Sequence, residues 1–337
     1  MPHDISVAIC TLNGAGKLPE VIKALKSELP SKAEILVIDD GSKDNSSEIA
    51  TKMSVRVIRH PENLGYGAAR QTAVDACRTE ILAYVDDSCV VTQGWYRGLQ
   101  NAWSSADSET RIIVGLMRPS QEPGYFGGYT SRYNPFVPIQ VNSVKTPLAR
   151  VFSYLGGRAA PIDGSPIFSA PNGNMSGRIK SIRDVGGFDS QASGGSEDDL
   201  LCSKIREKFG AGAIRFAEQC EVVHYETPTL KRVLRRSYSY GKSNSILAKK
   251  RKIAPIFFPG PSLLCFVTLW SFYLLGSGIG LMTIPLWVYL LFFRFSIISK
   301  KGNRRHIVLD PLITLAAEIC QNVGFLVGII KKNQYVA

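Results

Sequence analysis

The first 85 residues alternate between short apolar runs that are typical of β-strands and longer stretches with the spacing of amphipathic helices. The predicted strands are residues 5–11, 34–38, 55–59 and 81–85, and the predicted helices are residues 17–29, 44–53 and 68–77. Strands that alternate with helices indicate βαβ units, which form parallel sheets through right-handed crossovers. The sequence therefore predicts an α/β fold with a mostly parallel, Rossmann-like sheet.

Three of these strands end on polar or acidic side chains. Residues 11–13 follow the first strand, Asp39 and Asp40 the second, and Asp86 and Asp87 the fourth. Open α/β sheets bind ligands just beyond the carboxyl ends of their strands, so we expect these residues to meet at one edge. An isolated Asp-Asp pair is usually a solvated turn, but here the flanking chain supplies further polar strand ends. Paired carboxylates suit a divalent cation such as Mg²⁺ or Mn²⁺, which can neutralise a diphosphate.

Four ordered stretches resemble the family 2 glycosyltransferases. They are residues 7–13, residues 35–42, residues 63–70 and the strand that ends on Asp86 and Asp87. The last occupies the place of the family's Asp-x-Asp metal motif, although Ser88 stands where the family usually has its second Asp. The resemblance covers about residues 5–245 and rests on several motifs in order, which makes it more specific than any one of them. It implies an inverting enzyme with a GT-A-type domain that binds a nucleotide-diphospho-sugar.

The same resemblance implies roles for the polar residues of the first half. Asp39 is expected to hydrogen-bond the nucleobase and Asp40 to lie near the ribose. Thr11 and Asn13 are expected to line the same nucleotide pocket. Arg70 is expected to steady the phosphates or the acidic cluster, and its alternative is an ordinary ion pair on the surface of a helix.

The expected metal ligands are Asp86, Asp87 and His224, with Asp87 also close to the donor. His224 follows a predicted strand at the place where a family histidine can complete the metal or diphosphate site. A lone histidine is more often structural, so both interpretations stay open for it. Because a hydroxyl is a weaker ligand for a hard cation than a carboxylate, Ser88 predicts reduced metal affinity or a larger share for Asp87.

A second acidic cluster lies near residue 198. Residues 172–175, 185–189 and 195–200 follow the family's acceptor half in order and spacing. An inverting transfer needs a base that deprotonates the acceptor hydroxyl, and a positioned carboxylate meets that need. By resemblance Asp198 is this base and Glu197 orients the site. Acidic residues also favour the first turn of a helix, and the apolar residues that follow predict a helix starting here, so the two interpretations are compatible.

Two other stretches allow more than one interpretation. Aromatic residues from 117 to 168 are interleaved with Gly and Pro, which fits either a surface that stacks on sugar or lipid or a local core beneath a long loop. Residues 231–242 are basic and aromatic. They are expected either to close over the diphosphate or to form a basic juxtamembrane helix.

The net charge of +12 predicts an anionic partner. Basic clusters at residues 249–252, 300–305 and 331–332 flank strongly apolar segments, which favours a membrane surface over nucleic acid. No nucleic-acid-binding motif occurs in the sequence. The seven cysteines are scattered and contain no Cys-x-x-Cys pair, which favours a reducing compartment.

The membrane segments are predicted near the end of the chain. Residues 261–298 are almost wholly apolar, long enough for two spans of about 20 residues each. Basic clusters on both sides place both ends of this hairpin in the cytoplasm. Residues 311–330 carry polar side chains on one face and fit an amphipathic interfacial helix or a third span. The N-terminus lacks the features of a signal peptide, so the catalytic part is expected on the cytoplasmic face of the cell membrane.

These observations predict a catalytic domain at residues 1–245, with a donor half (1–116) and an acceptor half (117–245), followed by a membrane region at 246–337. The predicted activity is transfer of a sugar from a nucleotide-diphospho-sugar to a hydroxyl on a lipid-linked or cell-surface glycan precursor. One alternative is a degenerate nucleotide-sugar-binding membrane scaffold, which Ser88 favours and the acidic pairs disfavour. Another is a processive polysaccharide synthase, for which the expected Gln-x-x-Arg-Trp motif and further spans are missing.

Overall fold

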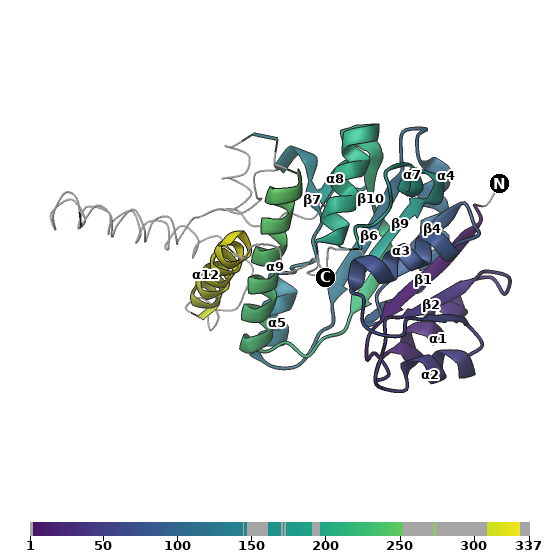
Figure 1. Cartoon of the computed structure of the whole chain (residues 1–337), viewed down its shortest axis with the longest axis horizontal. Helices are drawn as coiled ribbons and strands as arrows, with labels where there is room; N and C mark the ends of the chain where they lie inside the picture. Colours follow the sequence, from purple (N-terminus) through teal and green to yellow (C-terminus); the bar gives the residue numbers. More distant parts are fainter. Residues whose placement is uncertain are drawn as a thin grey trace.

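A computed structural model describes residues 3–143, 145–146, 161–169, 171, 173–190, 196–251, 273 and 309–330. Its centre is an eight-stranded sheet in the order β3-β2-β1-β4-β9-β6-β10-β5 (Figure 1). The strands are β1 (Ile5–Thr11), β2 (Ile35–Asp39), β3 (Arg56–Arg59), β4 (Ile81–Val85), β5 (Cys89–Val91), β6 (Ile112–Pro119), β9 (Asn174–Arg178) and β10 (Ile214–His224). Strands β1 to β4 are mutually parallel, as are β6 and β10, whereas β9 and β5 run antiparallel to their neighbours. The predicted mostly parallel α/β fold is confirmed.

The first 85 residues follow the sequence pattern closely. Helices α1 (Leu18–Glu28), α2 (Ser46–Lys52) and α3 (Tyr66–Ala76) alternate with β1 to β4, and their ends differ from the predicted ones by at most two residues. Helix α1 buries its apolar face against the sheet because its apolar residues recur at helical spacing: Leu18, Val21, Ile22 and Leu25. Each such side chain contributes about 1.5–3 kcal/mol when fully buried. In the register of the sheet Thr11 pairs with Asp39, so β1 and β2 end at the same edge.

Strand β9 runs antiparallel to its neighbours β4 and β6, and its polar side chains make buried hydrogen bonds there. Asn174 is buried and makes three hydrogen bonds: it accepts one from the indole of Trp95 (3.1 Å) and donates to the carbonyls of Leu116 (2.9 Å) and Cys220 (2.7 Å). Helix α4 (Trp95–Ser105), which supplies Trp95, thereby closes one face of the sheet. A buried amide with full partners is tolerated in a core where an unpaired one would cost about 1–3 kcal/mol.

The aromatic stretch after β6 forms a helix and a small second sheet. Helix α5 (Tyr125–Arg132) is followed by β7 (Ile139–Gln140), the 3₁₀ turn η1 (Val141–Ser143) and β8 (Ile167–Ser169). Tyr129 and Phe136 are buried, and Tyr129 packs against Tyr133 with ring centroids 4.8 Å apart. Phe136 belongs to the main core of the sheet, whereas Tyr154 lies outside the described residues.

The remaining described elements are α7 (Ile179–Asp184), α8 (Glu197–Phe209), the 3₁₀ turn η2 (Ala211–Ala213), α9 (Leu230–Arg251) and α12 (Leu309–Ile330). Of these, α9 and α12 lie at the end of the molecule away from α1 and α2 (Figure 1). The predicted basic stretch 231–242 is part of α9, and α9 continues without a break through the predicted domain boundary at 245. Helix α12 packs closely on α9, and glycines at the contact make this possible. A Cβ at Gly241 or Gly324 would lie within about 2.1 Å of a backbone oxygen of the other helix.

Helix α12 is also anchored to helix α5 by a buried charge. The Asp310 carboxylate is fully buried and accepts two hydrogen bonds from Arg132 of α5 (2.8 and 2.9 Å) and one from the Tyr125 hydroxyl (2.5 Å). The segment Ile313–Ile330 is long and apolar enough to cross a membrane, and only 11% of it is buried. The predicted hairpin at 261–298 lies outside the described residues except for Tyr273.

Candidate active site

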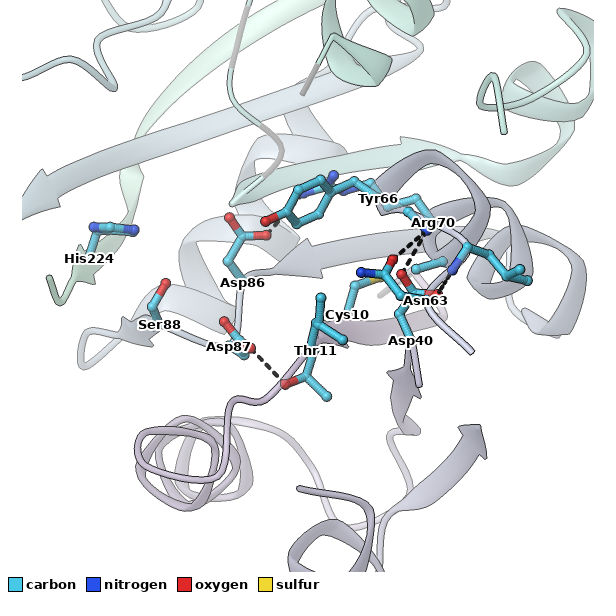
Figure 2. Close-up of a pocket in the computed structure, with 14 residues that line it drawn as sticks. Cys10, Thr11, Asp40, Asn63, Tyr66, Arg70, Asp86, Asp87, Ser88 and His224 are labelled. Atoms are coloured by element: carbon cyan, nitrogen blue, oxygen red, sulfur yellow. Dashed lines mark hydrogen bonds and ion pairs between the residues drawn. The ribbon is translucent and has the colours of Figure 1, made fainter. Parts of the chain in front are cut away.

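A cavity of about 670 Å³ opens at the carboxyl ends of β1, β2 and β4 and reaches the end of β10 (Figure 2). Its wall includes Thr11, Asp40, Asp86, Asp87 and His224. The prediction that the polar strand ends meet at one edge of the sheet is confirmed for Thr11, Asp40, Asp86 and Asp87. A cavity of this size holds a ligand as large as a nucleotide.

The acidic pair after β4 has two different environments. Asp87 is held by the Thr11 hydroxyl, which donates a hydrogen bond of 2.6 Å to its carboxylate. Burial raises the pKa of Asp87 to about 6, the Asp86 charge adds to this, and the Thr11 hydrogen bond opposes it. Asp86 is more open, with 35% of its side chain exposed. The loop after β1 can approach this closely because it carries Gly14, where a Cβ would lie 2.4 Å from an Asp87 oxygen.

Arg70 connects helix α3 with helix α8, which lie far apart in the sequence. It projects from α3, is buried, and donates one hydrogen bond to Asp86 (3.1 Å) and another to Glu197, the first residue of α8. Burial acts to lower the pKa of Arg70, but the charges of Glu197 and Asp86 outweigh it and raise the pKa. The alternative of an ordinary surface ion pair does not describe this residue, because both Arg70 and Glu197 are buried.

The two aspartates at the end of β2 have different surroundings. Asp39 is fully buried, accepts a hydrogen bond from the Ser42 amide (2.8 Å) and another from the Ser47 hydroxyl, and does not line the cavity. Asp40 does line it. The nucleobase contact of Asp39 stays a prediction, since in this structure the Asp39 oxygens bind the turn that follows β2. Asp40 is the carboxylate of this pair that a ligand in the cavity meets.

Asp40 is surrounded by hydrogen-bond donors. Its Oδ1 lies 2.7 Å from Nδ1 of His60 and 3.0 Å from the Leu64 amide, and its Oδ2 accepts from the Gly65 amide at 2.9 Å. The loop of Leu64 and Gly65 forms part of the cavity wall. His60 was not expected from the sequence, where a lone histidine outside the recognised motifs carries no signal.

Asn13 is placed beside the cavity rather than in its wall. Its backbone has a positive φ of 57°. Its side-chain oxygen accepts a hydrogen bond from the Lys43 backbone amide at 2.8 Å, and its backbone amide donates one to the Ser42 hydroxyl. Asparagine tolerates this left-handed conformation better than most residues. Asn13 therefore joins the loops after β1 and β2, whereas Thr11 faces the cavity.

The acidic cluster at residue 198 forms the first turn of α8, as predicted. Asp198 accepts a hydrogen bond from the Asp199 amide (2.8 Å), and Asp199 is bound by the Ser169 hydroxyl. Burial raises the pKa of Asp198 well above its ordinary value, Glu197 and Asp199 add to the rise, and Arg70 opposes it. Asp198 does not belong to the described wall of the cavity, and its connection to that wall runs through Glu197 and Arg70.

His224 ends β10 and faces the acidic pair across the cavity (Figure 2). Its Nδ1 is buried and has no hydrogen-bond partner within the part of the chain that the structure describes. Burial lowers the pKa of His224 despite the opposing charge of Asp86, which favours the neutral imidazole that binds metals. Among the described residues, however, no three His, Cys, Asp or Glu side chains stand close enough to hold one ion together. The predicted ligands Asp86, Asp87 and His224 therefore share the cavity without forming an assembled metal cluster.

Comparison with known proteins agrees with this architecture. Residues 6–156 match the model of the family described as Glycosyl transferase family 2. The pre-mycofactocin glycosyltransferase of Mycobacterium tuberculosis is 27% identical over 290 residues, which cover 82% of this chain and 54% of the relative. Glycosyltransferase AglE of Haloferax volcanii is 31% identical over 147 residues, 41% of this chain and 46% of the relative. The chain thus spans about half the length of these curated relatives.

Two solved structures share the fold. Mannosyltransferase PcManGT from Pyrobaculum calidifontis, in complex with GDP-Man and Mn²⁺, matches with a TM-score of 0.60 at 14% identity and covers 97% of this chain and 88% of its own. Glucosyl-3-phosphoglycerate synthase from Mycobacterium tuberculosis, with Mn²⁺, UDP and glucosyl-3-phosphoglycerate, matches with a TM-score of 0.52 at 17% identity over 75% of this chain and 81% of its own. Residues 6–156 thus match glycosyl transferase family 2, and the chain shares the GT-A-type fold of these two structures.

Proposed function

We propose that this chain is an inverting glycosyltransferase that moves a sugar from a nucleotide-diphospho-sugar to an acceptor hydroxyl. The observation that carries the proposal is the placement of Arg70. It joins Asp86, in the wall of a nucleotide-sized cavity, to Glu197, in the acidic first turn of α8. A donor in the cavity would therefore lie next to a group of carboxylates that can take a proton from the acceptor.

The cavity wall supplies what a nucleotide-diphospho-sugar needs. Asp40 offers a carboxylate oxygen to the nucleoside and is held in place by the Leu64 and Gly65 amides, and Thr11 lies nearby on β1. The acidic pair and His224 share the wall of the cavity, and carboxylates and a neutral imidazole are suitable ligands for a divalent cation. When bound there by Asp86, Asp87 and His224, Mg²⁺ or Mn²⁺ would neutralise the charge of the diphosphate. The Mn²⁺ found with both structural neighbours supports this assignment.

We assign the role of general base to Asp198. A base works best when its pKa lies near the working pH, and burial together with Glu197 raises the pKa of Asp198 in that direction. Glu197 is held by Arg70 and orients the turn that carries Asp198. In an inverting transfer the hydroxyl attacks the anomeric carbon while its proton passes to this carboxylate, and the nucleotide diphosphate leaves from the opposite face of the sugar.

We further propose that the enzyme works at the cytoplasmic face of the cell membrane as a multi-pass protein with a lipid-linked or cell-surface glycan acceptor. Helix α12 supports this proposal through one exposed apolar stripe at helical spacing: Ile319, Val323, Leu326 and Ile330. The apolar sequence at 261–298 and its basic flanks support it as well. Ser88 favours the rival function, a nucleotide-sugar-binding scaffold without turnover.

A screen of the full-length protein tests the choice between enzyme and scaffold. Purified protein in detergent is incubated with radiolabelled UDP- and GDP-sugars, with and without polyprenyl-phosphate-linked acceptors, in Mn²⁺, Mg²⁺ or EDTA. We expect cation-dependent transfer that is abolished in Asp86→Ala. The matched control Asp184→Asn changes an exposed carboxylate on α7 and should keep full activity. Nucleotide binding without transfer of any sugar would support the scaffold, and full transfer in excess EDTA would overturn the metal assignment.

A further inference from the structure

We propose that His60 is a positioning residue for the donor nucleotide, because it fixes the Asp40 carboxylate and the loop that Asp40 holds. His60 follows β3 at the edge of the sheet and is buried, with 7% of its surface exposed. The proposal rests on the proposed function in one respect, namely that the ligand of this cavity is a nucleotide. The role of His60 itself follows from its two ring contacts.

The two ring nitrogens of His60 contact different elements. Nδ1 lies 2.7 Å from Oδ1 of Asp40, and Nε2 lies 2.9 Å from the hydroxyl of Thr72 on α3. An ionised carboxylate only accepts hydrogen bonds, so Nδ1 carries the proton and donates it to Asp40. In the neutral ring Nε2 then accepts from the Thr72 hydroxyl. The backbone is fixed as well, because the His60 amide donates to the carbonyl of Asp39 (2.8 Å).

The Asp40 carboxylate in turn fixes the Leu64–Gly65 loop, which forms part of the cavity wall. Of its roughly four lone-pair sites, three are filled by His60, the Leu64 amide and the Gly65 amide. The remaining site is on Oδ2, in a carboxylate that lines the cavity. Without the His60 contact the carboxylate can rotate about its terminal torsion, which is broad in aspartate, and the two amides lose an aligned acceptor.

The same contacts also hold the start of α3. Gly65 precedes the first turn of α3 with a φ of 94°, a left-handed conformation that glycine adopts readily. Its amide is fixed by Asp40, and Thr72 lies further along the same helix. Because α3 carries Arg70, His60 links the nucleotide side of the cavity to the residue that bridges Asp86 and Glu197.

Two substitutions separate positioning from packing. In His60→Asn the amide nitrogen reaches the place of Nδ1 and can still donate to Asp40, whereas in His60→Gln the amide reaches toward Thr72 instead. We expect His60→Gln to weaken binding of UDP or GDP with Mn²⁺ by about 10- to 100-fold, the range for one hydrogen bond to a charged group. His60→Asn should keep a nucleotide affinity within about 3-fold of wild type, because its amide still donates to Asp40. The control His3→Gln makes the same change just before β1, at the amino ends of the parallel strands and therefore away from the cavity at their carboxyl ends.

Calorimetric titration gives the affinities, and amide hydrogen exchange of nucleotide-free protein gives a readout that does not depend on the ligand. Exchange at Leu64 and Gly65 should accelerate in His60→Gln and stay slow in His60→Asn. The positioning role is overturned if the two variants behave alike, or if His60→Gln binds nucleotide as wild type does with both amides equally protected. Wild-type protein that binds neither UDP nor GDP would instead contradict the donor site, and with it the role of His60 in donor binding.

Discussion

Replacing Arg70 with methionine tests the connection between the two halves of the active site. Methionine keeps most of the side-chain length and removes the guanidinium, so Glu197 and Asp86 lose their shared cation. Glu197 is 4% exposed and cannot regain water in place, whereas Asp86 is 35% exposed and can be hydrated. The cost therefore falls mainly on Glu197, and loss of one partner of a buried pair typically costs about 3–5 kcal/mol.

A double-mutant cycle turns this magnitude into a measurement. For a chain of this size each kcal/mol lowers the midpoint of thermal unfolding by about 2 °C, so Arg70→Met should lower it by about 6–10 °C. Glu197→Gln leaves Arg70 paired with Asp86 and should cost less, about 1–3 kcal/mol. The double variant should be more stable than the sum of the single changes predicts, by about 1–3 kcal/mol, because the pair is already broken in each single variant.

Tryptophan fluorescence reports the unfolding, because Trp95 and Trp103 are buried against the sheet. All variants are compared at one scan rate, since unfolding of a chain of this kind is often irreversible. Additive effects within about 0.5 kcal/mol would show that Arg70 and Glu197 do not act as a pair. A shift below about 2 °C in Arg70→Met would refute the reasoning from burial.

Two further changes test the acidic cluster and the anchor of α12. The pKa of Asp198 is raised above its ordinary value of 3.8, so its protonated form stabilises the fold fully below pH 3.8, and that contribution is lost as pH rises through the raised pKa. Asp198→Asn should therefore raise the unfolding midpoint at pH 8 and leave it unchanged at pH 3.5, and equal effects at both pH values would contradict the shift. Asp310→Asn leaves Arg132 without its buried carboxylate and should lower the midpoint by about 6–10 °C and expose α12 to proteolysis, with Asp184→Asn as the control. Unchanged cleavage would show that the anchor does not hold α12.

The donor half could be predicted because its strands and helices have clear hydrophobic periods and its functional residues follow strand ends. The sequence predicts both Asp39 and Asp40 in the nucleotide pocket, whereas only Asp40 lines the described cavity wall, because the Asp39 oxygens bind the turn that follows β2. The antiparallel strand β9 escaped prediction because Asn174 and Ser176 are polar, and their burial depends on the indoles of Trp95 and Trp103 far along the chain.

The bridge between Arg70 and Glu197 joins residues 127 positions apart, and local patterns contain no information about such a pair. His60 escaped notice for the same reason, because its meaning depends on Asp40 and Thr72 beside it in space. Helix α12 was expected from its composition, but its attachment to α5 through Asp310 was not. The hairpin at 261–298 stays a prediction.

The most direct test of the proposed mechanism is a comparison of wild-type protein with Asp198→Asn in a transfer assay that also measures donor affinity. Asparagine keeps the shape of the side chain and cannot accept the proton of the acceptor hydroxyl. A positioned base contributes about 10²- to 10⁴-fold, so turnover should fall by that factor while the affinity for the nucleotide-sugar stays nearly unchanged. If Asp198→Asn instead weakened donor binding and left turnover intact, Asp198 would belong to the donor site, and the base would have to be Glu197 or Asp199.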